Sequence, residues 1–150
     1  SRPTKPRPSA VRRARANAMD KETLDRIRMS AAFAVEKLGG GAGFPFGYNR
    51  ESVQWLEGFI ERQRVRGVDH GNLVSVLGSF LGEAIIAEAG GEWTKSDDGI
   101  GIAFQVGDSA SVCFPYAKVA KQFENGVAGG DGVASFYDFS VNLVAKGKLE

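Results

Sequence analysis

The spacing of apolar side chains predicts a helix at the start of the ordered part of the chain. From Leu24 to Leu38 these side chains recur at three- and four-residue intervals, which is the pattern of an amphipathic helix. Asp20 stands where an N-cap is expected, because its side chain can accept a hydrogen bond from the first turn. The run Gly39-Gly40-Gly41 predicts the end of this helix.

Two further helices are predicted before residue 90. One covers residues 49–66, begins at the capping side chain of Asn49 and ends at Gly67. The other covers residues 69–89 and is apolar almost all round, so we expect it to be buried between other elements. Close approach of another backbone to this helix is predicted from its stripe of small residues, which consists of Gly71, Ser75, Gly78 and Gly82.

The period of the pattern changes from helical to alternating after Gly91. Strands are predicted over residues 92–94, 100–106 and 109–114, and the turn signals between them are Asp97-Asp98-Gly99 and Gly107-Asp108. Two helices follow, one opened by Pro115 and one capped by Asp131. The sequence therefore predicts an α+β fold in which helices pack on a small three-stranded antiparallel meander, in the order ααα-βββ-αα. A single domain over residues 19–150 is expected.

Positive charge is concentrated at the start of the chain. Residues 1–17 hold six basic side chains, no acidic ones and three prolines, so we expect residues 1–18 to form a disordered basic tail. Met19-Asp20-Lys21 resembles a translation start, which leaves the origin of the tail open. The remaining residues include 13 basic and 18 acidic side chains, a net charge of −5. This balance argues against nucleic-acid binding by the domain itself.

The composition of the chain argues against several classes of protein. Cys113 is the one cysteine, so no disulfide forms within the chain and a cytoplasmic location is expected. One cysteine and one histidine do not make a structural zinc site. The longest apolar stretch, residues 73–89, contains Glu83 and Glu88 and is shorter than the roughly 20 residues of a membrane span. We therefore expect a core helix there and no membrane contact.

Two short segments have some features of ligand-binding loops but lack their chemistry. Residues 39–49 contain five glycines, yet no Lys-Ser or Lys-Thr pair follows, as a phosphate-binding loop requires. Asp97-Asp98-Gly99 lacks the alternating ligands and the distal glutamate of a calcium loop. No cofactor is therefore expected. The aromatic side chains of the glycine-rich segment either pin this connection to the core or form a recognition loop: Phe44, Phe46 and Tyr48.

Few side chains offer catalytic chemistry. His70 lies at the start of the third predicted helix and Cys113 lies among apolar neighbours in the third strand, and no motif supports a dyad between them. Glu83 interrupts the most apolar helix, so it either pairs with a base or lies at an exposed helix edge. A cleft that joins Glu83 to Trp93 is the functional alternative. The candidate basic partners of Glu83 are Arg62, Arg64, Arg66, Lys118 and Lys121.

Four blocks of the sequence resemble, in the same order, a family of small bacterial proteins. The blocks are FGYNRESVQWLEGFIERQR (Phe46–Arg64), LGSFLGEAIIAEAGGEW (Leu77–Trp93), FPYAKVAKQFENG (Phe114–Gly126) and DGVASFYDF (Asp131–Phe139). The family is catalogued as a domain of unknown function, so the resemblance implies a bacterial, soluble domain and no particular activity. Proteins of similar size and pattern occur among toxin-immunity and accessory families, which is an analogy of fold and context.

These observations lead to a non-enzymatic protein-interaction domain as the first hypothesis, with an immunity or accessory role by analogy. The expected partner is another protein. Its expected binding surfaces are the loop with Phe44, Phe46 and Tyr48 and the outer face of the second helix, with Arg50, Glu57, Glu61 and Arg62. One alternative is a small-molecule-binding or hydrolytic domain that uses a cleft of Glu83 and Trp93. The other is nucleic-acid association through residues 1–17, which predicts binding that weakens steeply with salt.

Overall fold

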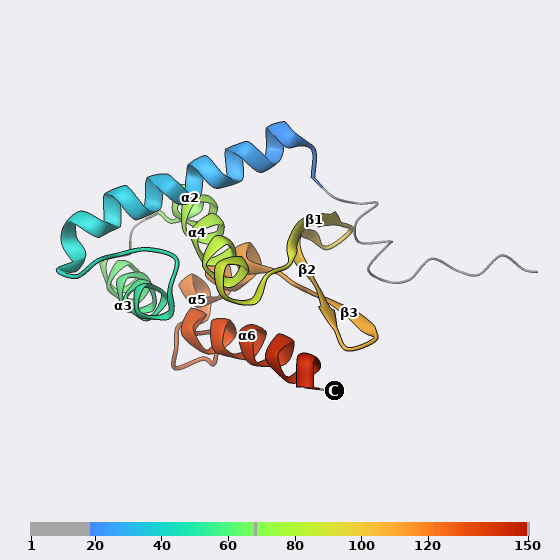
Figure 1. Cartoon of the computed structure of the whole chain (residues 1–150). Helices are drawn as coiled ribbons and strands as arrows, with labels where there is room; N and C mark the ends of the chain where they lie inside the picture. The colour runs from blue at the N-terminus through green and yellow to red at the C-terminus, as the bar shows by residue number, and fades with distance from the viewer. Residues whose placement is uncertain (1–18, 68, 150) are drawn as a thin grey trace, which may run out of the picture.

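The structure is a computed structural model that describes residues 19–67 and 69–149, with side chains up to residue 146. The expectations for the basic tail, residues 1–18, lie outside the described residues. The predicted α+β class and the predicted order of elements are confirmed (Figure 1). The elements are α2 (Lys21–Ala42), α3 (Arg50–Arg66), α4 (Gly71–Ala89), β1 (Glu92–Ser96), β2 (Gly99–Val106), β3 (Ser109–Cys113), α5 (Pro115–Asn125) and α6 (Val133–Leu149).

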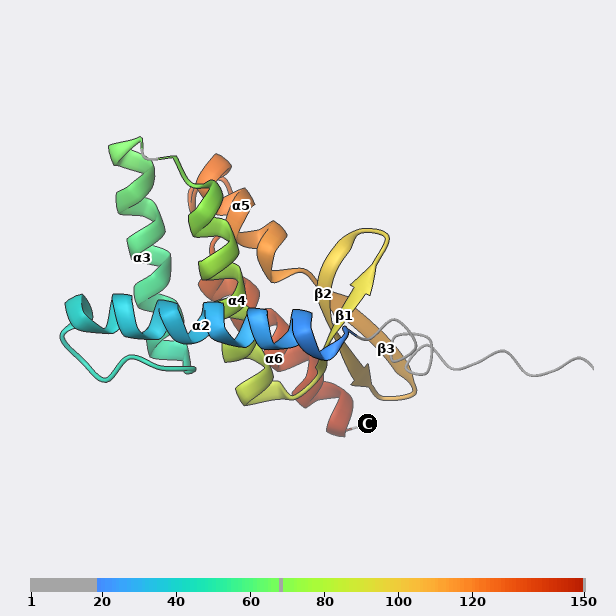
Figure 2. The same cartoon turned by 90° about the horizontal axis from the view of Figure 1, so that it is seen from above.

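Helix α4 forms the centre of the fold. α2 crosses one side of it, while α5 and α6 pack on the other (Figures 1 and 2). Its residues from Leu77 to Gly82 are all buried, as the apolar pattern predicts for a helix covered on several sides. By length and composition alone, α4 is also apolar enough to cross a membrane. The packing of three helices around its middle is that of a core helix.

The small residues of α4 receive aromatic rings, not a second backbone. A Cβ at Gly82 would overlap the indole ring of Trp93 from β1, and a Cβ at Gly78 would overlap the ring of Tyr116 from α5. The two rings also contact each other, with centroids 5.7 Å apart. The expectation that another backbone approaches this stripe was therefore wrong. A flat aromatic ring occupies the space that each of these two glycines leaves free.

Helix α2 continues through the glycines that were expected to end it. Gly39, Gly40 and Gly41 are helical, and the helix ends at Gly43, whose φ of 77° is the left-handed conformation of a C-cap. Glycine costs about 1 kcal/mol relative to alanine inside a helix but does not forbid the conformation. Phe46 of the following loop lies against Gly39, so the absence of a side chain there lets the loop fold back on the helix. The N-cap prediction is confirmed, since Asp20 accepts a hydrogen bond from the Thr23 N–H at 2.8 Å.

The three strands form one antiparallel sheet in the order β1-β2-β3. Both connections are two-residue turns, and Gly107 provides the positive φ of 58° that the second turn needs. β2 is the central strand and carries the buried side chains of Ile102 and Phe104. Through β2 the sheet packs on α6, while β1 and β3 are its edges. As a result, β3 projects from the helical body beside α6 (Figures 1 and 2).

Candidate functional site

The loop between α2 and α3 is pinned to the core by its aromatic rings. The ring centroids of Phe46 and Tyr48 lie 5.0 Å and 5.7 Å from that of Phe80, a side chain of α4 with no exposed surface. Phe44 packs on Phe46 with centroids 6.1 Å apart. Of the two readings of this glycine-rich segment, the geometry favours a structural connection over a mobile recognition loop.

The two arginines expected on the outer face of α3 both have intramolecular partners. Arg50 donates from Nε and Nη2 to the two carboxylate oxygens of Asp138 on α6, at 2.8 Å and 2.9 Å, and these hydrogen bonds lower the pKa of Asp138. Arg62 lies over the indole of Trp55, with its guanidinium carbon 5.3 Å from the ring centroid. Both side chains stay exposed. The ring of Trp55 also contacts that of Phe46, with centroids 5.6 Å apart, so Arg62 and the aromatic loop lie on the same indole, whereas Arg50 is bound to α6.

Glu57 and Glu61 face α5 and α6, so the expectation that they lie on the outer face of α3 was wrong. Glu61 accepts hydrogen bonds from the Val127 N–H, from Gln122 and from Arg64 Nη1, the last at 2.9 Å. Burial acts to raise the pKa of Glu61, but these hydrogen bonds outweigh it and lower the pKa. The two acids therefore hold the segment between α5 and α6 in place.

The first turn of α6 is capped by side chains from other helices. Gln122 of α5 accepts from the Val133 N–H at 3.0 Å, and Glu57 of α3 accepts from the Ala134 N–H at 3.2 Å. Gln122 also donates to the Glu57 carbonyl at 3.0 Å. Asp131, the cap expected from the sequence, instead pairs with Lys118 at 3.0 Å. The expected cap was wrong because acceptors distant in sequence reach these backbone N–H groups.

Glu83 and Trp93 bind each other. The Trp93 Nε1–H donates to Glu83 Oε2 at 3.0 Å, and Arg28 of α2 lies 3.8 Å from Glu83 Oε1. None of the basic partners expected from the sequence is the one observed. Trp93 is 3% exposed, so its ring belongs to the core. A hollow of about 310 Å³ adjoins this pair between Arg28, Ile86 and Trp93.

His70 and Cys113 do not form a dyad. The imidazole of His70 stacks on Phe123 with centroids 4.6 Å apart. Burial raises the pKa of Cys113 to about 12, against the smaller opposing effect of a hydrogen bond with Ser140. A thiol with this pKa is protonated at neutral pH, whereas a cysteine nucleophile must reach the thiolate form. Among the described residues, no cluster of three potential metal-binding side chains occurs.

A mainly apolar hollow lies between the sheet, α5 and α6, and we call it the β3–α6 groove. Its volume is about 510 Å³, within the range of protein ligand sites, about 300–1,000 Å³. Phe139 is 68% exposed and Val112 is 37% exposed on its walls. Its apolar lining consists of Phe104, Val112, Phe114, Ala117, Phe136, Phe139 and Leu143.

Polar groups of the β3–α6 groove are few and lie among this apolar surface. Ser111 and Ser140 contribute hydroxyls, and Cys113 contributes a protonated thiol. The charged side chains of the wall are Lys118 and Lys121 of α5 and Asp98 of the turn between β1 and β2. Lys118 is bound to Asp131, and Lys121 is exposed. A groove with this lining can hold apolar side chains.

The strand that lines this groove has an unprotected edge. β3 pairs with β2 in an uninterrupted register and has no partner strand on its other side among the described residues. Natural proteins protect such edges with charges, prolines or bulges, and the β3 sequence, Ser-Ala-Ser-Val-Cys, contains none of these. An open edge therefore stands directly beside an apolar hollow.

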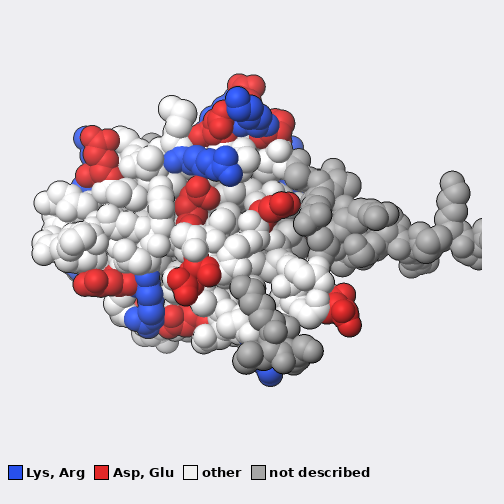
Figure 3. All heavy atoms as spheres, in the orientation of Figure 1, with Lys and Arg blue, Asp and Glu red and all other residues white. Residues whose placement is uncertain are grey.

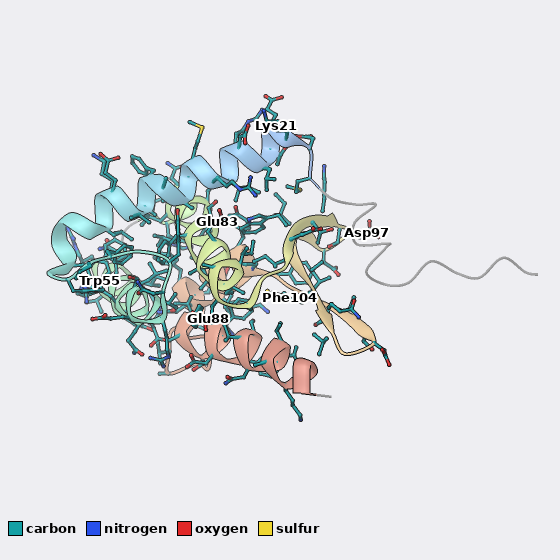
Figure 4. The ribbon with its side chains drawn as sticks, in the orientation of Figure 1. Lys21, Trp55, Glu83, Glu88, Asp97 and Phe104 are labelled. Carbon is teal, nitrogen blue, oxygen red and sulfur yellow. The ribbon has the colours of Figure 1, made fainter. Side chains whose placement is uncertain are left out.

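The groove lies far from the aromatic loop expected from the sequence. In Figure 4, Trp55, whose ring contacts that of Phe46 in the loop, lies on the left in α3, whereas Phe104, which lines the groove, lies at the sheet. The signal that sequence reasoning missed is a second apolar stripe on α6, made by Phe136, Phe139 and Leu143 at helical spacing. The buried face of α6 accounts for Val133, Tyr137 and Val144. Of the second stripe, Phe136 is partly buried against the core, whereas Phe139 is 68% exposed.

No protein-family model, curated protein or solved structure matches this chain.

Proposed function

We propose that this chain is a non-enzymatic protein-binding domain and that the β3–α6 groove holds its partner. The observation that carries the proposal is the unprotected edge of β3 beside an apolar hollow of about 510 Å³. Large exposed aromatic side chains next to a hollow are typical anchors of protein interfaces, and Phe139 is such a side chain. The resemblance to small bacterial proteins extends the proposal to a bacterial domain, and the analogy with families of similar size and pattern extends it to an accessory or immunity role.

The alternative of a binding or hydrolytic cleft at Glu83 and Trp93 finds less support in the geometry. Glu83 is engaged by Trp93 and Arg28, so neither oxygen of its carboxylate is directed to an open site without a partner. For nucleic acid, a continuous basic surface would be expected. On the face shown in Figure 3, lysines and arginines of the described residues are interspersed with acidic side chains. Nucleic-acid association through residues 1–17 lies outside the described residues and stays a prediction.

To test the proposal, the full chain is immobilised and used to select linear peptides from a random displayed library. Selected peptides are then synthesised, and their Kd is measured by fluorescence anisotropy. Phe139→Ser changes a side chain that is 68% exposed, and the matched control is Phe33→Ser on α2, which is 49% exposed. We expect the Phe139 variant to weaken peptide binding at least about tenfold and the Phe33 variant to bind as the wild type does.

Two results would contradict the proposal. One is the failure of the wild-type chain to enrich any peptide over a blank surface. The other is an equal loss of binding in the Phe139→Ser and Phe33→Ser variants, because the two side chains lie on different elements. The urea midpoint of each variant shows whether the fold is retained.

A further inference from the structure

The backbone of β3 presents two residues to a new strand. In a two-residue hairpin the residues that flank the turn, here Val106 and Ser109, form a hydrogen-bonded pair. Pairs alternate along an antiparallel ladder, so Ser111 and Cys113 also direct their N–H and C=O groups toward β2. The N–H and C=O groups of Ala110 and Val112 therefore point away from the sheet, toward the open edge.

The side chains on the inward face of β3 are too small to fill the groove. Ser111 pairs with Phe104 and Cys113 pairs with Ile102, so these two small side chains share the face of the sheet that carries the buried residues of β2. Across the groove from them lie the larger side chains of Phe136 and Phe139. The next strand outward would place alternate side chains into this space, because successive residues of a strand point to opposite faces.

The charge of the groove selects the chemistry of its occupant. Lys118 is paired with Asp131, and Asp98 is the one acidic side chain of the described lining. Lys121 lies within electrostatic range of Asp131 but makes no ion pair or side-chain hydrogen bond with any residue that the structure describes. Residues 1–17 carry six basic side chains and no acidic one, so their sequence offers Lys121 no opposite charge. An acidic side chain on the occupant would form the ion pair that Lys121 lacks.

We infer that the β3–α6 groove binds an extended segment of a partner polypeptide as a fourth strand next to β3. This inference rests on the proposed function and adds the mode of binding. The segment pairs with the outward backbone groups of Ala110 and Val112. It places large apolar side chains at alternate positions against Phe136 and Phe139, and an acidic side chain near Lys121. Main-chain hydrogen bonds of this kind supply affinity, while the pockets for alternate side chains supply specificity.

An N-methyl scan of a selected peptide tests the backbone pairing. Each position of the peptide is methylated in turn on its backbone nitrogen, and the Kd for the full chain is measured. A strand that pairs with β3 donates hydrogen bonds from every second residue, so binding should fall roughly tenfold or more at alternate positions and change little between them. A peptide bound as a helix would instead lose binding with a period of three to four residues.

Two substitutions in the chain test the same inference from the other side. Val112→Pro removes the outward N–H of β3 but leaves the ladder with β2, because that N–H is not part of it. Val112→Ala keeps the N–H and controls for the lost side chain. Lys121→Glu should weaken the binding of acidic peptides roughly tenfold. The control Lys95→Glu changes a lysine on the exposed side of β1 and should leave this binding unchanged.

The outcomes separate the two proposals. Strand addition is supported if the methyl scan alternates and Val112→Pro binds more weakly than Val112→Ala. If peptides bind and Phe139→Ser abolishes their binding, but the scan does not alternate, the groove binds a partner in another form and only this inference fails. If no peptide binds and the wild type sediments as a dimer that Val112→Pro dissociates, a second copy occupies the edge and the inference is overturned.

Discussion

At the scale of single residues, Glu83 shows how an acid is accommodated in the most apolar helix. Its carboxylate accepts the hydrogen bond of the Trp93 indole at 3.0 Å and lies 3.8 Å from Arg28. The buried indole N–H needs an acceptor, since a buried donor without one costs about 1–3 kcal/mol. The acceptor is more important than the charge, because Arg28 is more than half exposed and exposed ion pairs contribute little.

We therefore predict different effects for two substitutions of Glu83. Glu83→Ala leaves the Trp93 N–H without an acceptor and should lower the free energy of unfolding by about 1–3 kcal/mol. Glu83→Gln retains an acceptor oxygen and should lower it by less than about 1 kcal/mol. Urea unfolding followed by far-UV circular dichroism measures both values. Equal losses in the two variants would show that the charge, and not the hydrogen bond, is what stabilises this position.

Two glycines in helices should respond oppositely to alanine. At Gly82 the added methyl group would overlap the Trp93 ring, so Gly82→Ala should destabilise the fold by about 1–3 kcal/mol through overpacking. At Gly40, in the last turns of α2, nothing lies within 4 Å of the added group. Gly40→Ala should therefore stabilise the fold by about 0.5–1 kcal/mol. The same urea titration measures both, and stabilisation by Gly82→Ala would contradict the close packing of the ring.

At the scale of elements, α6 depends on its neighbours for the start of its helix. Gln122 has no exposed surface and accepts from the Val133 N–H while donating to the Glu57 carbonyl. One amide side chain therefore connects α3, α5 and α6. Its hydrogen bonds are buried, so their loss cannot be compensated by water.

Gln122→Met should separate the hydrogen bonds of this residue from its volume. Methionine fills a similar space but offers neither the acceptor nor the donor, so we expect a loss of about 2–4 kcal/mol in the free energy of unfolding. The control Gln54→Met changes an exposed residue of α3 and should stay within about 0.5 kcal/mol of the wild type. A loss at Gln122 no larger than that at Gln54 would mean that α6 does not need this cap.

The ion pair between α5 and the start of α6 should make stability depend on pH. The hydrogen bonds from Lys118 and then Asn125 lower the pKa of Asp131 below its ordinary value of 3.8. The unfolded chain therefore binds a proton at this site more readily than the folded chain. The stabilising contribution is complete above the unfolded pKa and is lost as the pH falls through the lower, folded pKa.

Asp131→Asn should accordingly reduce the pH dependence of unfolding. Between about pH 5 and pH 2 the wild type should lose stability more steeply than this variant, while Asp25→Asn, an exposed change in α2, should follow the wild type. Urea midpoints across this range measure the slopes. If Asp131→Asn kept the full wild-type slope, other carboxylates would have to account for the acid sensitivity.

At the scale of the whole molecule, the sequence predicts elements better than it predicts what they contact. The order ααα-βββ-αα follows from periodicity and turn residues, and the caps Asp20 and Asn49 follow from local chemistry. The end of α2 does not, because a run of glycines does not indicate which one takes the left-handed conformation. The observed positive φ falls at Gly43, where the chain turns back to place Phe46 on the helix.

The candidate site could be predicted only in part, for the same reason. Glu83 was recognisable as an interruption of an apolar helix, but its partner Arg28 depends on how α2 crosses α4. The sequence pattern predicts Glu57 and Glu61 on the exposed side of α3, because local periodicity does not show where α5 and α6 pack. The β3–α6 groove lies between the projecting strand and α6. In the sequence, the second apolar stripe, with Phe139, is what indicates it.

The trans-capping of α6 has a consequence for the exchange of backbone hydrogens with deuterated solvent. First-turn amides of a helix have no partner within the helix and in general exchange quickly. Here the amides of Val133 and Ala134 are bonded to side chains of α5 and α3, so local fraying of α6 alone does not release them. Their exchange requires separation of three helices, and these two amides should therefore report the opening of the whole helical body.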